Sequence, residues 1–121
     1  MTPDELEQRT KSFAVRVVKL VDALPKSAAG RTFGNQLIRS ASSVAANYRA
    51  TRRGRSGKEF LAKLSIVVEE ADESAFWLEM IIETKLMTKT KVAPLLQEAD
   101  ELTRIFAASR KTTARKKSPN R

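Results

Sequence analysis

The chain has 121 residues, 41% of them apolar, which suits one domain with a real core and is too short for two domains of ordinary size. It contains no cysteine and no histidine, which excludes disulfides and removes the commonest general base and metal ligand. The start of the chain carries acids and no apolar run, and no segment approaches the ~20 apolar residues of a membrane span. We expect a soluble, cytoplasmic protein with no cofactor, bound metal or membrane partner.

Apolar residues recur at steps of three and four in four segments, which is the spacing of one buried helical face. The first segment opens with a Thr2–Glu5 capping box and ends before Pro25. The third opens with a similar Ser56–Glu59 pattern. The expected helices span residues 3–24, 28 (or 32)–51, 57–87 and 90–108.

Each predicted helix has one apolar face, and no segment alternates as a strand does. The predicted core consists of Leu6, Phe13, Val17, Leu20, Leu24, Phe33, Leu37, Ala41, Val44, Tyr48, Phe60, Leu64, Val67, Ala71, Leu78, Ile82, Val92, Leu95, Leu96, Ala99, Leu102 and Phe106. With short connections, these faces predict an all-α fold, an antiparallel up-down-up-down four-helix bundle over residues 1–108. Residues 109–121 hold six basic residues and no periodic apolar ones, so we expect a disordered basic tail there.

Charge is segregated along the chain, whose formal net charge is +9. Residues 23–58 contain eight basic residues and no acid, whereas residues 59–87 contain seven acids and two bases. A basic block of this kind in a small domain indicates a polyanion partner, and nucleic acid is the first candidate.

The densest part of the basic block surrounds the predicted start of the third helix, where free N–H groups and the helix dipole favour anions. The candidate nucleic-acid-binding residues are Arg49, Arg52, Arg53, Arg55 and Lys58. A solvated turn that keeps the protein soluble is the alternative. No base-reading element or interleaved aromatic residue accompanies these bases, so binding should be weakly sequence-specific and strongly salt-dependent.

The third helix carries a second apolar strip with embedded carboxylates. The candidate subunit-interface residues are Ile66, Glu70, Glu73, Trp77 and Ile81. Aromatic enrichment beside a few charges is typical of interface cores, although Trp77 and the isoleucines could instead pack within the same molecule. Arg39 lies opposite the apolar face of the second helix and is our candidate for a structural ion pair with these carboxylates.

No group of residues indicates catalysis. The acids of residues 69–73 lack the histidine partners of a ferritin-like metal site, and Ser40, Ser42 and Ser43 have no visible base. The serines are better interpreted as small spacers between closely packed helices. We therefore expect a non-enzymatic protein without a metal site.

Four motifs together resemble the four-helix-bundle proteins encoded in 23S rRNA intervening sequences. They are Leu24-Pro25; Gln36-Leu37-x-Arg39-Ser40-x-Ser42-Ser43-Val44-x-x-Asn47; Ser56-x-Lys58-Glu59-Phe60-x-x-Lys63-Leu64; and Glu70-Ala71-x-Glu73-Ser74-x-x-Trp77-Leu78-Glu79. The resemblance covers about residues 24–86, in order and with compatible gaps.

The resemblance implies a homopentameric ring of antiparallel bundles with no established enzymatic activity. The family is similar to the accessory protein of diversity-generating retroelements, a basic pentamer that binds nucleic acid and a reverse transcriptase. Family members often have Asn-Ile-Ala-Glu-Gly where this chain has Asn47-Tyr48-Arg49-Ala50-Thr51. The missing acid makes this end of the second helix more basic and favours a polyanion surface.

The sequence thus leads to a non-enzymatic, homo-oligomeric helical bundle, pentameric by resemblance, that binds nucleic acid, with RNA favoured, through phosphate contacts. The alternative is an oligomeric protein–protein scaffold or accessory subunit that docks an acidic or polymerase-like partner.

Overall fold

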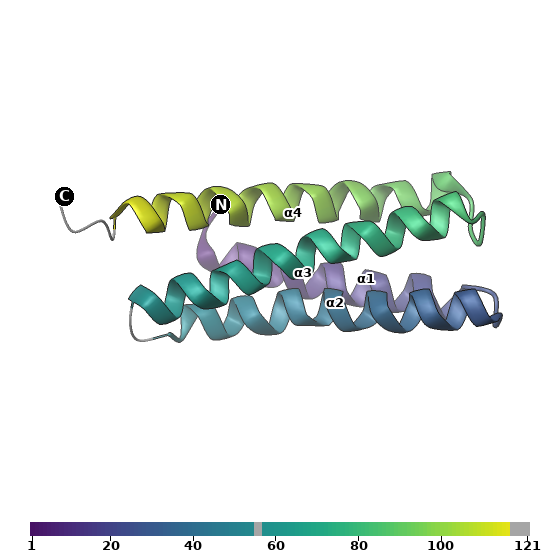
Figure 1. The fold of residues 1–121 in the computed structure, drawn as a ribbon, viewed down its shortest axis with the longest axis horizontal. Coiled ribbons are helices and arrows are strands. Elements are labelled where there is room, and N and C mark those ends of the chain that lie inside the picture. The colour runs from purple at the N-terminus through teal and green to yellow at the C-terminus, as the bar shows by residue number, and fades with distance from the viewer. Residues whose placement is uncertain (55–56, 117–121) are drawn as a thin grey trace.

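The computed structural model describes residues 1–54 and 57–116. These residues form four helices and no strand: α1 (Pro3–Asp22), α2 (Ala28–Arg52), α3 (Gly57–Glu83) and α4 (Lys89–Lys116). Successive helices run in opposite directions (Figure 1). The α1–α2 and α3–α4 connections lie at one end, here called the loop end. The start of α1, the end of α2, the start of α3 and the end of α4 lie at the other, the terminal end, and the predicted antiparallel four-helix bundle is confirmed.

Side chains cap the starts of the first two helices. The Glu5 N–H donates to Thr2 Oγ1 at 3.1 Å while the Thr2 N–H donates to Glu5 Oε1 at 2.7 Å, which is the predicted capping box. Ser27 accepts from the Gly30 N–H at 3.1 Å and starts α2 at the earlier of its two expected positions. The expected pattern at Ser56 lies outside the described residues.

Helix α3 ends four residues before the expected Met87. Lys85 adopts a left-handed φ of 60°, and the Leu86 N–H reaches back to the Ile81 carbonyl at 3.1 Å. This is a Schellman ending, which usually has glycine at the left-handed position. Because lysine occupies it here, the sequence carries no stop signal.

Helix α4 continues eight residues past its expected end, so the predicted disordered tail is wrong for residues 109–116. That prediction depends on the absence of periodic apolar residues. However, four of these eight residues are lysine or arginine, which favour helix, and cations near a helix C-terminus interact favourably with its dipole. Residues 117–121 lie outside the described part.

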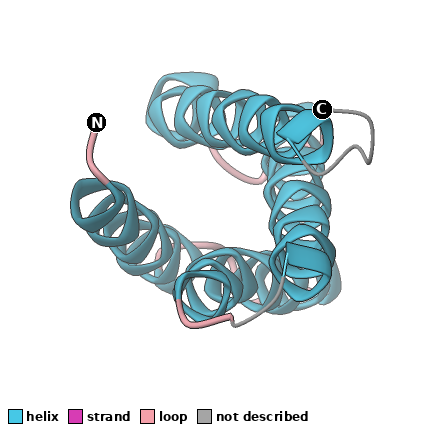
Figure 2. Ribbon diagram, turned by 90° about the vertical axis from the view of Figure 1, so that its left-hand side faces the viewer, coloured by secondary structure: helices cyan, strands magenta, loops and turns pink. Residues whose placement is uncertain are grey.

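The core follows the predicted faces, with Phe13, Leu37, Leu78 and Phe106 fully buried. Helices α2 and α3 are the inner pair of the bundle: α1 packs on α2, α4 packs on α3, and the contact between α1 and α4 is the least extensive of those between adjacent helices (Figure 2). The rings of Tyr48 and Phe106 meet with centroids 5.0 Å apart and join α2 to α4 across the interior.

Small buried residues let α2 and α3 approach closely. The hydroxyl oxygens of Ser40 and Ser74 lie 2.9 Å apart, and both residues are fully buried. Ser40 also donates to the Leu37 carbonyl at 3.2 Å. Ser40 is therefore a spacer of the predicted kind, whereas Ser42 is exposed and Ser43 accepts from the Asn47 side chain instead.

An arginine on α1 joins it to α4 across their less extensive contact. Arg9 Nε and Nη2 donate to the two carboxylate oxygens of Glu98 at 2.7 Å each, and Nη2 also donates to Glu101 at 2.8 Å. The Glu98 side chain is only 15% exposed, so Arg9 replaces much of the water that would solvate an exposed carboxylate. These hydrogen bonds raise the pKa of Arg9 above its ordinary value.

We predict that Arg9→Ala lowers the free energy of unfolding by about 1–3 kcal/mol, since it leaves a mostly buried carboxylate without its donor. Urea denaturation followed by circular dichroism measures the change. Arg16→Ala is the matched control, because Arg16 is exposed on the same helix and makes no ion pair within the described residues. Equal losses in the two variants would contradict the interhelical role of Arg9.

Candidate nucleic-acid and subunit interfaces

Four of the predicted nucleic-acid-binding residues are exposed in the structure. Three of them make no ion pair within residues 1–54 and 57–116: Arg49 and Arg53 at the end of α2, and Lys58 in the first turn of α3. Arg49 lies on the α1–α2 side of the bundle, where it shares a groove with Lys11. Arg55 lies outside the described residues.

Arg52 faces α1. Its Nη2 donates to Asp4 at 2.8 Å and its Nη1 to Glu7 at 2.7 Å, so one arginine bridges two carboxylates of another helix. Hydrogen bonds from Arg52 to Asp4 and Glu7 raise the pKa of the guanidinium. Its charge is thus already balanced, which leaves it less suited to phosphate than the sequence indicated. No local pattern reveals this pairing, because the two acids lie more than 40 positions earlier.

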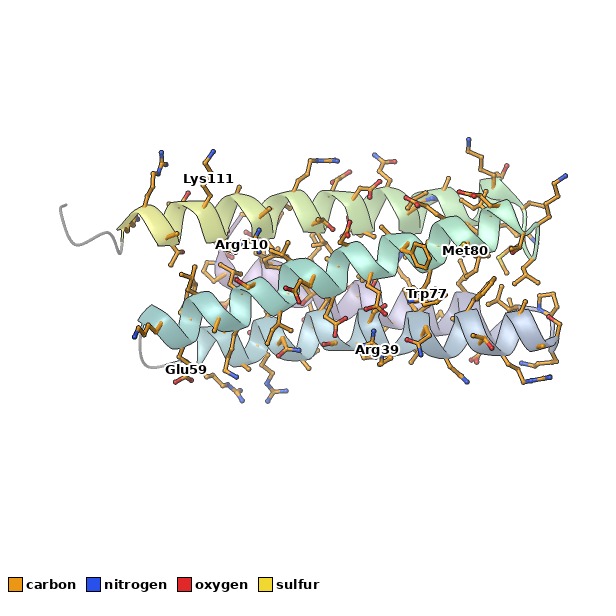
Figure 3. The ribbon with its side chains drawn as sticks, viewed as in Figure 1. Arg39, Glu59, Trp77, Met80, Arg110 and Lys111 are labelled. Carbon is orange, nitrogen blue, oxygen red and sulfur yellow. The ribbon has the colours of Figure 1, made fainter. Side chains whose placement is uncertain are left out.

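The extended part of α4 brings further basic residues to the terminal end. Arg110 and Lys111 line an open groove with Leu61 and Ser65 of α3. Figure 3 shows both basic residues near the end of the bundle where α3 starts. Arg115 and Lys116 follow in the last turn of α4.

We call these residues together the basic end. The basic end comprises Arg53, Lys58, Arg110, Lys111, Arg115 and Lys116. No ion pair involves any of the six within the described residues. Four of the six fall in the segment predicted as a disordered tail, and the lack of acids after Glu101 is the signal that could have found them.

The outward strip on α3 differs from the predicted one at Ile81, which is fully buried and cannot belong to a subunit interface. Because α3 packs against both α2 and α4, its buried face is wider than one stripe and includes position 81. Ile66 is 40% exposed, as an interface residue should be. Phe76, which the sequence analysis missed, is 48% exposed and is the largest apolar side chain on the outside of α3.

Trp77 is half-buried and packs between two phenylalanines. Its ring centroid lies 5.7 Å from that of Phe33 and 4.8 Å from that of Phe76, with the second pair edge to face. Trp77 Nε1 donates to Glu73 Oε2 at 3.0 Å. Trp77 therefore packs largely within its own molecule and supports the exposed Phe76 from beneath.

Arg39 of α2 makes the cross-helix ion pairs for which the sequence made it a candidate. Its Nη1 donates to Glu70 Oε2 at 3.0 Å and its Nη2 donates to Glu73. The hydrogen bond from Trp77, followed by the one from Arg39, holds the pKa of Glu73 below its ordinary value. Glu70 and Glu73 thus have a partner within the chain, which limits what they offer to another subunit.

Other kinds of site are not evident in the described residues. No group of three or more acids, cysteines or histidines among them is placed to hold a metal ion. Of the helices described, none combines the length and apolar character needed to cross a membrane.

We predict that Glu73 makes folding stability depend on acidic pH. Because its pKa is lowered in the folded state, its contribution is complete above the ordinary value of 4.5 and is lost as the pH falls through the lowered pKa. The free energy of unfolding of the wild type should therefore fall more steeply below pH ~4.5 than that of Glu73→Gln. Denaturation followed by the fluorescence of Trp77, the one tryptophan in the chain, measures both.

Glu79→Gln serves as the control, since Glu79 is exposed on the same helix and makes no ion pair within the described residues. Parallel pH profiles for wild type and Glu73→Gln would show that this carboxylate is not coupled to folding.

Comparisons of the sequence and the fold with known proteins identify the family of this chain. No curated protein matches the chain. Among solved structures, the chain is similar to a protein of unknown function from the S23 ribosomal protein family of Bacteroides thetaiotaomicron, with a TM-score of 0.84 and 28% identity over 92% of this chain and 99% of that one. A family model described as 23S rRNA-intervening sequence protein matches residues 5–108. The chain therefore belongs to the 23S rRNA-intervening sequence protein family.

Proposed function

We propose that this protein is a non-enzymatic, homo-oligomeric helical bundle that binds structured RNA through phosphate contacts at its basic end. The observation that carries the proposal is the concentration of six basic side chains, from three helices, that make no ion pair within the described residues. Such a surface attracts the phosphate backbone without regard to sequence.

The arrangement at the start of α3 supports an anion site there. Lys58 lies in the first turn of α3, where backbone N–H groups lack helical partners and the dipole favours negative charge. Arg53 precedes it at the end of α2, and Arg110 approaches α3 from α4. Basic side chains from α2 and α4 thus lie beside the first turns of α3, an arrangement that favours a phosphate group.

The name of a relative favours RNA over other polyanions. The similar Bacteroides thetaiotaomicron protein comes from a ribosomal protein family, and folded RNA is the polyanion of the ribosome. No exposed aromatic residue accompanies the basic end within the described residues, so stacking on unpaired bases has no platform there. The proposal therefore favours a folded RNA whose backbone is read by charge and shape.

Self-association is the second part of the proposal. The exposed Ile66 and Phe76 on α3 form the apolar part of a candidate interface, and the resemblance described above implies a pentamer. Repeating the basic end in an assembly multiplies the phosphates that one RNA can engage, which raises affinity without any change to the individual subunit.

We predict that the triple variant Lys111→Ala, Arg115→Ala, Lys116→Ala binds a labelled RNA hairpin more weakly and with a flatter salt dependence. Removing one phosphate-binding charge should reduce the slope of log K against log salt by about 0.7–0.9. Alanine preserves helix propensity, so α4 should remain folded. Fluorescence anisotropy at several KCl concentrations measures both affinity and slope.

The matched control removes the same charge from the loop end: Lys19→Ala, Lys89→Ala, Lys91→Ala, all three exposed. The control should bind nearly as the wild type does. Equal weakening in the two triples would show that net charge alone drives binding and would overturn the site. Tighter binding to polyglutamate than to RNA at equal salt would favour an acidic protein partner instead.

A further inference from the structure

The side of the bundle formed by α1 and α2 carries an open groove of about 310 Å³. Its lining consists of Lys11, Ala14, Val15, Ser42, Ala45, Ala46 and Arg49. Val15 is 54% exposed, and α2 contributes only small side chains between it and Arg49. An apolar floor of small residues allows another helix to approach closely.

The rim of this groove is positively charged. Lys11 of α1 and Arg49 of α2 are both exposed, and neither makes an ion pair within the described residues. The surface is thus apolar in the middle and basic at its edge, so a matching partner should be apolar with acids beside it.

Helix α3 presents such a surface on its outside. Residues at steps of three and four lie on one stripe of the helix, and here they are Ile66, Glu69, Glu73, Phe76 and Met80. Glu69 makes no ion pair within the described part of the chain and lies one turn from Glu73, which repels it. This α3 ridge is apolar at Ile66 and Phe76 and acidic between them.

The ridge and the groove lie on different flanks of one molecule. Seen along the bundle, α3 forms one side, while α1 lies on the other and α2 between them (Figure 2). A protomer therefore cannot place its own ridge in its own groove. Pairing of two ridges would oppose acids with acids, and pairing of two grooves would oppose bases with bases, both of which are unfavourable.

We propose that the α3 ridge of one copy docks in the α1–α2 groove of the next, with Phe76 and Ile66 against Val15 and the small residues of α2, and Glu69 facing Lys11 or Arg49. The inference rests on the self-association in the proposed function and names the two surfaces that carry it. Such head-to-tail contacts use a different surface on each partner, and they close into a ring when the rotation between copies permits.

Two one-sided variants test the pairing. The groove variant, Lys11→Glu with Arg49→Glu, keeps an intact ridge. The ridge variant, Ile66→Ser with Phe76→Ser, keeps an intact groove and retains Glu69, which the acidic groove variant repels. By light scattering coupled to size exclusion, each alone should be monomeric. An equimolar mixture should give a heterodimer of twice the monomer mass and nothing larger, because one intact ridge–groove interface remains per pair.

The control, Lys91→Glu with Arg104→Glu, changes charge as much as the groove variant does, at exposed positions on α4, and should assemble as the wild type does. Circular dichroism establishes that all variants are folded. A monomeric wild type would overturn both this inference and the proposed self-association. A wild-type assembly that persists in either one-sided variant, or a mixture that stays monomeric, would overturn the ridge–groove pairing alone.

Discussion

The close approach of α2 and α3 is the constraint on which the other features of this bundle depend. Ser40 and Ser74 meet at 2.9 Å in the centre of that interface, where larger side chains would separate the helices. Because α2 and α3 form the inner pair, α1 packs on α2 and α4 packs on α3, and only a thin contact remains between α1 and α4. That thin contact explains why an ion cluster at Arg9, rather than apolar packing alone, joins the outer helices.

Within the described residues, each cross-helix ion pair involves one of three arginines, and each arginine bridges two acids of another helix. Arg9 joins α1 to α4, Arg39 joins α2 to α3, and Arg52 joins α2 to α1. The planar guanidinium suits this role because it offers several donors in a fixed geometry. Among the described basic residues outside these pairs, six form the basic end and two line the groove, while most of the acids outside these pairs lie on α3. The segregation seen along the chain therefore persists on the surface after the internal pairs are satisfied.

Periodicity predicts the four helices and nearly all of their buried faces, since burial of one stripe per helix is a local property of the sequence. Periodicity fails where the role or burial of a residue depends on distant parts of the chain. The sequence predicts Arg52 as a phosphate ligand because its two acidic partners lie far away in the chain, on α1. It predicts Ile81 to be exposed because the width of the buried face of α3 depends on two neighbouring helices. The two wrong helix ends have local causes: a lysine in the left-handed position at Lys85, and an α4 extension supported by propensity and the dipole rather than by an apolar stripe.

The two proposed surfaces reinforce each other geometrically. Rotation about a symmetry axis preserves the height of every atom along that axis, so in a cyclic head-to-tail assembly the basic ends of all copies stand at one level. The ridge and groove lie along the flanks of the bundle, whereas most of the basic end lies at its tip, so assembly leaves those charges exposed and brings them together. Mutual repulsion between them then disfavours the empty ring and is relieved when a polyanion binds across several subunits. Phosphate binding and assembly are therefore expected to be linked, with each strengthening the other.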